Sequence, residues 1–226
     1  MGCYSLTESE AGSDALSGKT TAVLNDKGTH YILNGQKIFV TNGAWAEVAV
    51  TFASVNGKYT AFILDKDCDG WVVGDEEKKM GIKGSSTVTF FYEDCKVPVE
   101  NVLGEVGEGG PIAFNVLYVG RFKLGVTTGA GARNVIDGAL DYATERQQFN
   151  RSIKEFGMLR KKFANMVVRC WEADSINYMI SGSIDLALST IDNKSKNYYE
   201  VVQKVIEDHG IEASISKIVG SETLAY

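Results

Sequence analysis

The sequence predicts an α+β fold, in which a β-barrel or β-sandwich domain is followed by long antiparallel helices of a helical bundle. Short apolar segments separated by Asn-Gly, Asp-Gly and Gly-Ser turns fill residues 1–103, a spacing typical of barrels and sandwiches. From residue 112 onwards, apolar residues recur with the period of a helix. Residues 104–110 form a Gly-rich link between the two patterns. We therefore expect a β domain at 1–106 and a helical domain at 107–226.

The strands of the β domain are expected at short apolar segments, and one pair has a specific turn. Tyr31–Leu33 and Gln36–Val40 flank Asn34-Gly35, a dipeptide that favours the type I′ turn of a β-hairpin. The other strands are expected at residues 4–7, 20–24, 47–55, 59–64, 71–73 and 87–92. The sequence therefore predicts a hairpin whose turn is Asn34-Gly35.

Two long helices are expected in the second half of the chain. Pro111 stands in a first helical turn, where proline is accepted, and residues 112–142 follow with a helical period. Residues 152–188 form the second helix, after which a polar loop precedes shorter helices at 199–206 and 211–226. The buried stripe of the second helix is expected to comprise Leu159, Phe163, Met166, Cys170, Ala173, Ile180 and Ile184.

Composition and charge exclude several functional classes. The formal net charge is −6 and no Lys/Arg cluster has the spacing that a phosphate backbone requires, so no nucleic-acid partner is expected. Cys3, Cys68, Cys95 and Cys170 form no C-x-x-C pair, which disfavours a zinc site or disulfide framework and fits a reducing compartment. No apolar run approaches the roughly 18 residues of a membrane span. The chain opens within a strand pattern and ends within a helix pattern, so we expect a fragment of a longer protein without a signal segment.

Histidines and glycines give no sign of a metal or dinucleotide site. His30 and His209, the only histidines, have no partners at metal-ligand spacing, and their scarcity also weakens any Ser-His-Asp triad. Gly129-Ala-Gly131 lies within a helix pattern and not between a strand and a helix. We interpret these small residues as sites of close helix packing.

Two polar turns could hold a ligand. In residues 4–14 a short strand enters a polar turn, where Gly12 permits close approach and Thr7 and Ser13 offer hydroxyls. Alone, such a segment is more often an ordinary turn. The basic segment 78–87 is either a solvated hairpin or a shallow grip for an anion or amide.

Two arginines of the first long helix are also candidates. Arg146 precedes the break at the end of this helix, where its forked guanidinium is well placed to meet a phosphate. Arg121 lies within the helix, and a lone helical arginine is usually a surface ion pair of low energy.

Four segments in collinear order resemble signatures of the acyl-CoA dehydrogenase family. They are YSLTESEAGSD (4–14), NGQKIFVTNG (34–43), KMGIKGSST (79–87) with Val97-Pro98 and 101–104, and ERQQF (145–149). The resemblance covers essentially the whole chain, without the N-terminal helical domain of the family. KKMGIK (78–83), GRF (120–122) and SKIVGSE (216–222) are similar to the very-long-chain branch.

The resemblance implies a flavoenzyme of fatty acid β-oxidation. The implied reaction is the α,β-dehydrogenation of a long-chain acyl-CoA to the trans-2-enoyl-CoA, with hydride transfer from Cβ to FAD and removal of the α proton by a carboxylate. Electrons then pass to an electron-transfer flavoprotein. The implied compartment is the mitochondrion for a eukaryotic source and the cytoplasm for a bacterial one.

The resemblance also implies two sets of contact residues. FAD contacts are expected from Tyr4, Leu6, Thr7, Gly12, Ser13, Phe39, Val40, Thr41, Arg146, Gln148 and Phe149. Acyl-CoA contacts are expected from Ser13, Ser85, Tyr118, Gly120 and Arg121. Phe39 stands where tryptophan is commoner, which keeps the aromatic face and loses an indole N–H. Arg146 and its neighbours would reach the FAD of a second subunit, so a homodimer or larger homo-oligomer is expected.

No catalytic base and no metal ligand is assigned within residues 1–226. Some branches of the family carry the base on the first long helix, where this chain has Gly120, and others carry a Glu at a position beyond Tyr226. A positioned base contributes about 10²–10⁴ in rate, so we expect little activity from this chain alone. The alternative is a non-catalytic interaction or assembly protein that retains the fold.

Overall fold

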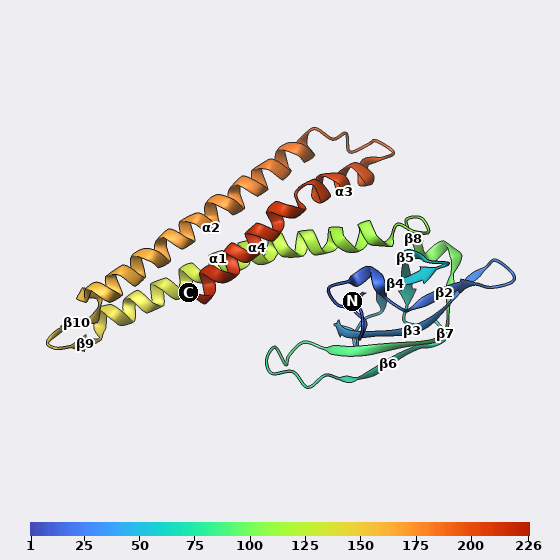
Figure 1. Cartoon of the computed structure of the whole chain (residues 1–226), viewed down its shortest axis with the longest axis horizontal. Coiled ribbons are helices and arrows are strands. Elements are labelled where there is room, and N and C mark those ends of the chain that lie inside the picture. Colours follow the sequence, from blue (N-terminus) through green and yellow to red (C-terminus); the bar gives the residue numbers. More distant parts are fainter. The chain divides into compact units, whose positions relative to one another are not determined.

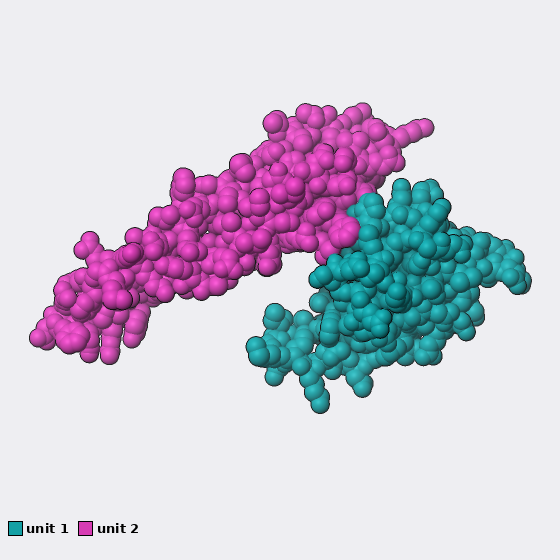
Figure 2. All heavy atoms as spheres, viewed as in Figure 1, with its two compact units in different colours: residues 1–113 teal, residues 114–226 magenta.

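The computed structural model describes residues 1–226, which form two compact units, Met1–Ala113 and Phe114–Tyr226 (Figure 2). Unit 1 contains β1 (Gly2–Ser5), β2 (Thr21–Leu24), β3 (His30–Thr41), β4 (Val48–Val55), β5 (Lys58–Asp65), β6 (Trp71–Glu76), β7 (Thr87–Pro98), β8 (Val102–Leu103) and the start of α1 (Gly109–Glu145). Unit 2 contains the rest of α1, β9 (Gln147–Gln148), β10 (Arg151–Ser152), α2 (Gly157–Ser189), α3 (Tyr198–Asp208) and α4 (Gly210–Ala225). None of these helices combines the length and apolarity needed to cross a membrane.

The strands of unit 1 form one mixed, eight-stranded sheet (Figure 1). Its order is β6-β7-β3-β2-β4-β5-β8, and β1 pairs with β4 in parallel. The end strands β6 and β8 do not pair with each other, so the sheet stays open. The predicted α+β class, a β domain followed by long helices, is confirmed, without a closed barrel.

The predicted hairpin at Asn34-Gly35 is wrong, because β3 runs through this dipeptide without turning. The pairing of β3 with β7 is irregular between Leu33 and Gly35, as expected for a bulge. Gly35 has a φ of +148°, and a Cβ there would lie 2.8 Å from Thr20 Cα. Glycine is therefore needed for the close approach of Thr20 and not for a turn.

Large aromatic side chains fill the core of unit 1. Phe62, Phe90 and Tyr92 are almost fully buried, and they project from β5 and β7 into one apolar cluster. Their rings meet neighbouring aromatic rings edge-on, for example Phe90 and Trp71 with centroids 4.9 Å apart. This rigid core supports the surface loops of the unit.

Unit 2 is built from long helices that approach through small residues. The α1 helix ends at Glu145, and the β9–β10 hairpin, with Phe149 and Asn150 at positive φ, reverses the chain into α2 (Figure 1). A Cβ on Gly129 of α1 would touch Ala173 Cβ of α2 at 3.6 Å, which confirms the interpretation of this glycine as a packing residue. In the predicted stripe of α2, Cys170, Ala173 and Ile180 are buried and the other members are half-buried.

Candidate functional site

Strand β3 has a second bulge, and this one presents an aromatic ring at the surface of unit 1. The register with β7 shifts between Lys37 and Val40, and Phe39 between them has a φ of +57°. A bulky residue at positive φ is strained, and such strain concentrates at functional sites. The Phe39 side chain is 61% exposed, whereas Val40 is buried. The bulge therefore turns a large apolar ring outwards.

Hydroxyl groups without intramolecular partners lie on the segments around this bulge. The backbone N–H of Ile38 donates to the carbonyl of Thr7 at 2.8 Å, which fixes Thr7 beside β3. Thr7 is half-buried, whereas Thr41 at the end of β3 and Ser13 in the loop after β1 are exposed. None of these three hydroxyls makes a hydrogen bond within the chain, so each remains available to a ligand.

A buried ion pair lies directly beneath these segments. Lys37 Nζ donates to Glu8 Oε1 at 2.5 Å and to the carbonyl of Leu6 at 3.2 Å, and the Lys37 side chain has no exposed surface. Burial lowers the pKa of Lys37, and Glu8 offsets part of this effect. Burial would raise the pKa of Glu8, but Lys37, Thr20 and Lys19 hold that pKa below its ordinary value by hydrogen bonds and charge.

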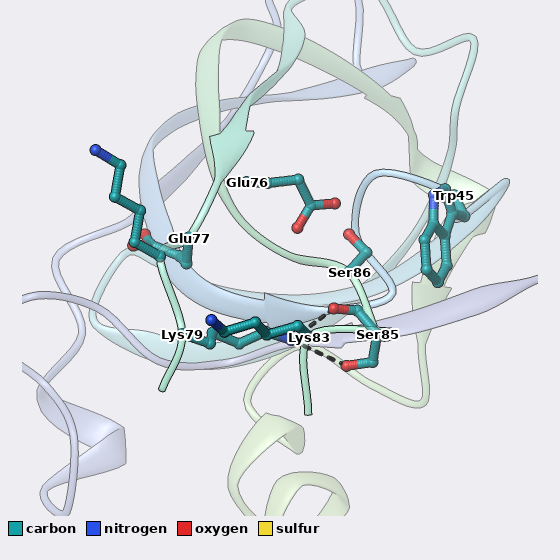
Figure 3. A pocket seen from close by; sticks show the side chains of 8 residues that line it. Trp45, Glu76, Glu77, Lys79, Lys83, Ser85 and Ser86 are labelled. Carbon is teal, nitrogen blue, oxygen red and sulfur yellow. Dashed lines mark hydrogen bonds between the residues drawn. The ribbon is translucent and has the colours of Figure 1, made fainter. Parts of the chain in front are cut away.

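A pocket of about 590 Å³ opens beside the end of β3 (Figure 3). Thr41 pairs with Thr87 across the sheet, and the N–H of Asn42 donates to the carbonyl of Ser86 at 3.1 Å. The pocket is lined by Trp45, Glu76, Glu77, Lys78, Lys79, Lys83, Ser85 and Ser86. Thr41 is thereby brought next to the loop that carries Ser85.

Lys79 organises the wall of this pocket. Its Nζ donates to Ser85 O at 2.5 Å, Ser85 Oγ at 3.1 Å and Thr87 Oγ1 at 2.9 Å, and Figure 3 shows the two bonds to Ser85. Ser85 Oγ accepts from Lys79, so its own proton is left for a ligand. Glu76 accepts from the N–H of Thr87 at 2.9 Å, and this bond lowers the pKa of Glu76.

The other expected FAD contacts of unit 1 lie at different depths. The Tyr4 hydroxyl donates to Ala113 O at 3.1 Å, and burial raises the pKa of Tyr4 to about 12. The side chains of Leu6 and Val40 are buried, so a ligand could reach these residues only through their backbone. Gly12 is exposed in the loop that also holds Ser13.

The expected contacts of unit 2 form two groups. Arg146, Gln148 and Phe149 are exposed at the end of α1 and on the hairpin that follows, and Arg146 makes no ion pair. Tyr118, Gly120 and Arg121 lie within α1, where Arg121 donates to Ser214 Oγ at 3.3 Å. The Arg121 guanidinium also lies 5.6 Å from the centroid of the Tyr118 ring, and a Cβ on Gly120 would meet open space.

Sequence reasoning missed Glu8, Lys37 and Lys79. The alternation of β3 could have drawn attention to Lys37, because this cation occupies an inward-facing position of an otherwise apolar strand face. No comparable signal marks Glu8, whose partner lies 29 residues away. No group of three or more His, Cys, Asp or Glu side chains is arranged to hold a metal ion, and all four cysteines are free.

Comparison with known proteins matches both parts of the chain to one family. Residues 3–95 match the acyl-CoA dehydrogenase middle domain, and residues 107–226 match the acyl-CoA dehydrogenase C-terminal domain. A probable acyl-CoA dehydrogenase of Bacillus subtilis is 44% identical over 100% of this chain and 38% of its own length. The mitochondrial very long-chain specific acyl-CoA dehydrogenase of Homo sapiens is 38% identical over 98% of this chain and 33% of its own length.

A solved structure extends the match to three dimensions. The crystal structure of an acyl-CoA dehydrogenase of Bacillus anthracis, complexed with FAD, superposes with a TM-score of 0.92 and 45% identity. The match covers 98% of this chain and 38% of that chain, so this chain spans less than half the length of such relatives. Both family matches and the fold agree, and the chain therefore belongs to the acyl-CoA dehydrogenase family.

Proposed function

We propose that this chain is the flavin- and acyl-CoA-contacting part of an FAD-dependent dehydrogenase that converts long-chain acyl-CoA to trans-2-enoyl-CoA. One observation carries the cofactor assignment. Phe39, whose backbone is strained, exposes its ring near Thr7 and Thr41, whose hydroxyls have no partner within the chain. An exposed aromatic ring flanked by free hydroxyls fits a planar, polar-edged ring system such as the isoalloxazine of FAD.

The chemistry of these donors agrees with FAD. The Phe39 ring offers an apolar face, and Thr7, Thr41 and Ser13 offer hydroxyls that can donate to ring nitrogens or carbonyls or accept from a ring N–H. When bound, FAD supplies the hydride acceptor that no amino-acid side chain provides. These residues of unit 1 would bind the flavin ring and orient it, and the buried core beneath them keeps the binding surface rigid.

Acyl-CoA contacts are proposed on both units. In unit 1, Ser85 can donate its free proton into the pocket next to Thr41, and Ser13 stays exposed on the neighbouring loop. In unit 2, Tyr118, Gly120 and Arg121 present a ring, an open position and a cation on α1. The preference for long chains is supported by the similarity to the very long-chain specific enzyme of Homo sapiens.

Partners and domain limits follow from the same proposal. We assign residues 1–106 to the middle domain and 107–226 to the C-terminal domain. Arg146, Gln148 and Phe149 are exposed and free to meet the FAD of a second subunit, which supports a homodimer or larger assembly. Electrons would leave to an electron-transfer flavoprotein. Since no catalytic base is assigned within residues 1–226, we propose that this chain binds FAD and acyl-CoA but does not catalyse the dehydrogenation by itself.

The cofactor assignment is tested by titrating the purified chain with FAD and following flavin fluorescence and the visible absorption band after desalting. We expect a retained band for the wild type. Thr41→Ala removes one hydrogen-bonding group and should weaken binding by about three- to tenfold. Thr21→Ala, which also truncates an exposed threonine of the same sheet, is the matched control and should bind as the wild type does. If the wild-type chain retains no flavin after desalting, the assignment of FAD as the cofactor is refuted.

A further inference from the structure

We propose that Glu8 and Lys37 are positioning residues that fix the three proposed FAD-contacting segments of unit 1 relative to one another. This inference rests on the proposed function for its ligand, but its geometry stands on the buried ion pair alone. The segments are Thr7 after β1, the loop 9–17 that contains Gly12 and Ser13, and the Phe39 bulge of β3. Neither Glu8 nor Lys37 is exposed enough to contact a ligand with its charged group.

Glu8 closes the base of the loop. Its carboxylate accepts from the backbone N–H of Lys19 at 2.5 Å and from that of Thr20 at 3.2 Å, so residue 8 is tied to the far end of the loop. Gly18 leaves the necessary space, because a Cβ there would lie 2.7 Å from Glu8 Oε1. Glu8 and Ala11 also exchange backbone hydrogen bonds of 3.2 Å, which close the first turn of the loop.

Lys37 joins this closed loop to β3. Besides Glu8, its ammonium group reaches the carbonyl of Leu6, the residue before Thr7. The next residue of β3, Ile38, donates its N–H to Thr7 O at 2.8 Å. Phe39, at positive φ, follows immediately. One ion pair is thus linked by direct bonds or by adjacent residues to every FAD contact segment of unit 1.

The energetics of burial favour a positioning role over a stabilising one. Removing two charges from water is expensive, and a buried ion pair is often no more stabilising than well-packed apolar residues of similar volume. An apolar pair at these positions would fill the same space without fixing the direction of three backbone segments. Conformational specificity at the ligand surface therefore accounts for the placement of this pair.

The test uses the full chain and the double variant Glu8→Gln/Lys37→Met, which removes both charges with little change in volume. Without flavin, amide hydrogen exchange is measured at Ala11 and Ile38. With FAD, the dissociation constant and the visible absorption spectrum are measured. If the loop occupies its competent arrangement about tenfold less often, exchange should speed up and the apparent FAD dissociation constant should rise by the same factor. Val97→Ala, a core truncation in β7, controls for lost stability and should leave the flavin spectrum unchanged.

A second variant keeps the test decisive if the double variant does not fold. Glu8→Asp retains the charge but withdraws the carboxylate by one methylene, so exchange should speed up at Lys19 and Thr20 and the FAD spectrum should shift. Unchanged exchange in the variants that fold would overturn the inference whether or not FAD binds. Faster exchange with unchanged FAD affinity and spectrum would overturn the positioning role. Faster exchange in a chain whose wild type binds no FAD would refute the proposed function and, with it, the flavin role of the pair.

Discussion

Each of the two units of this chain has an interior made of a different kind of buried residue. Unit 1 buries large aromatic side chains together with a complete ion pair, Glu8 and Lys37. Unit 2 buries mainly glycine, alanine and small polar side chains, such as Asn177, whose amide oxygen accepts from Ser216 Oγ at 2.6 Å. It leaves large apolar residues at its surface, among them Trp171, which is 70% exposed.

This difference shows which contacts fix the structure of each unit. In unit 1 an aromatic core underlies a surface with one strained residue, Phe39, and a buried ion pair bonds the loop after β1 to β3. In unit 2 the close approach of helix backbones fixes the structure, because a Cβ on Gly220 of α4 would lie 2.5 Å from Gly125 O of α1. Unit 1 should therefore be most sensitive to changes in charge, and unit 2 to added volume.

The largest effect is expected from breaking the ion pair of unit 1. Lys37→Met leaves Glu8 as an unpaired buried charge and should lower the free energy of unfolding of unit 1 by about 3–5 kcal/mol. Urea denaturation followed by the fluorescence of Trp45 and Trp71, in a Trp171→Phe background, isolates this unit. The added Glu8→Gln change should restore most of the loss. A loss below about 1 kcal/mol for Lys37→Met would show that this pair contributes no more than a surface ion pair, and that unit 1 is not especially sensitive to changes in charge.

A smaller loss is expected from adding one methyl group to unit 2. A Cβ at Gly125 would lie 2.6 Å from backbone atoms of Ser216, so Gly125→Ala should destabilise the helices by about 1–3 kcal/mol despite the better helix propensity of alanine. Gly138→Ala, on the same helix but with open space around it, is the control and should stabilise by up to about 1 kcal/mol. Circular dichroism at the helical band during denaturation measures both. Stabilisation by both variants would show that α1 and α4 do not approach closely.

The smallest effect is expected on the pH dependence of the stability of unit 1. Because folding lowers the pKa values of Glu8 and Glu76, the unfolded chain binds more protons than the folded one between these lowered values and about pH 4.5. Stability from these carboxylates is present above that pH and is lost as the pH falls through their folded-state values. Glu76→Gln should therefore flatten the acid limb of the stability profile of unit 1, measured by urea denaturation at stepped pH. A profile as steep as that of the wild type would exclude the bond between Glu76 and the N–H of Thr87 as a source of acid sensitivity.

Local sequence patterns predicted the helices and most strands well. They failed where contacts between residues distant in the sequence determine the backbone conformation. Helical periodicity located α1 and α2 because it reports a buried face directly, and the break after Arg146 appears as the β9–β10 hairpin. Asn34-Gly35 has the local chemistry of a turn, but Gly35 is required by the approach of Thr20. A turn preference within two residues could not reveal that contact.

The candidate site was predictable to a similar extent. The resemblance pointed to Thr7, Phe39 and Thr41, and the structure brings the segments that carry them together on unit 1. It could not reveal that Val40 faces the core or that the ion pair of Lys37 lies beneath the surface. The position of Val40 depends on the bulge after Lys37, and a bulge leaves little trace in the sequence. The ion pair depends on Glu8, which lies 29 residues from Lys37 and which no local pattern marks.

Binding of FAD to the Phe39 surface of unit 1 is tested most directly by mapping backbone amide chemical shifts of the 24.6 kDa chain during FAD titration. We expect the largest shifts at residues 7, 12–13 and 39–41, and we expect Thr41→Ala to raise the dissociation constant for FAD. An absence of shifts, or shifts that gather elsewhere and leave these residues unchanged, would contradict it.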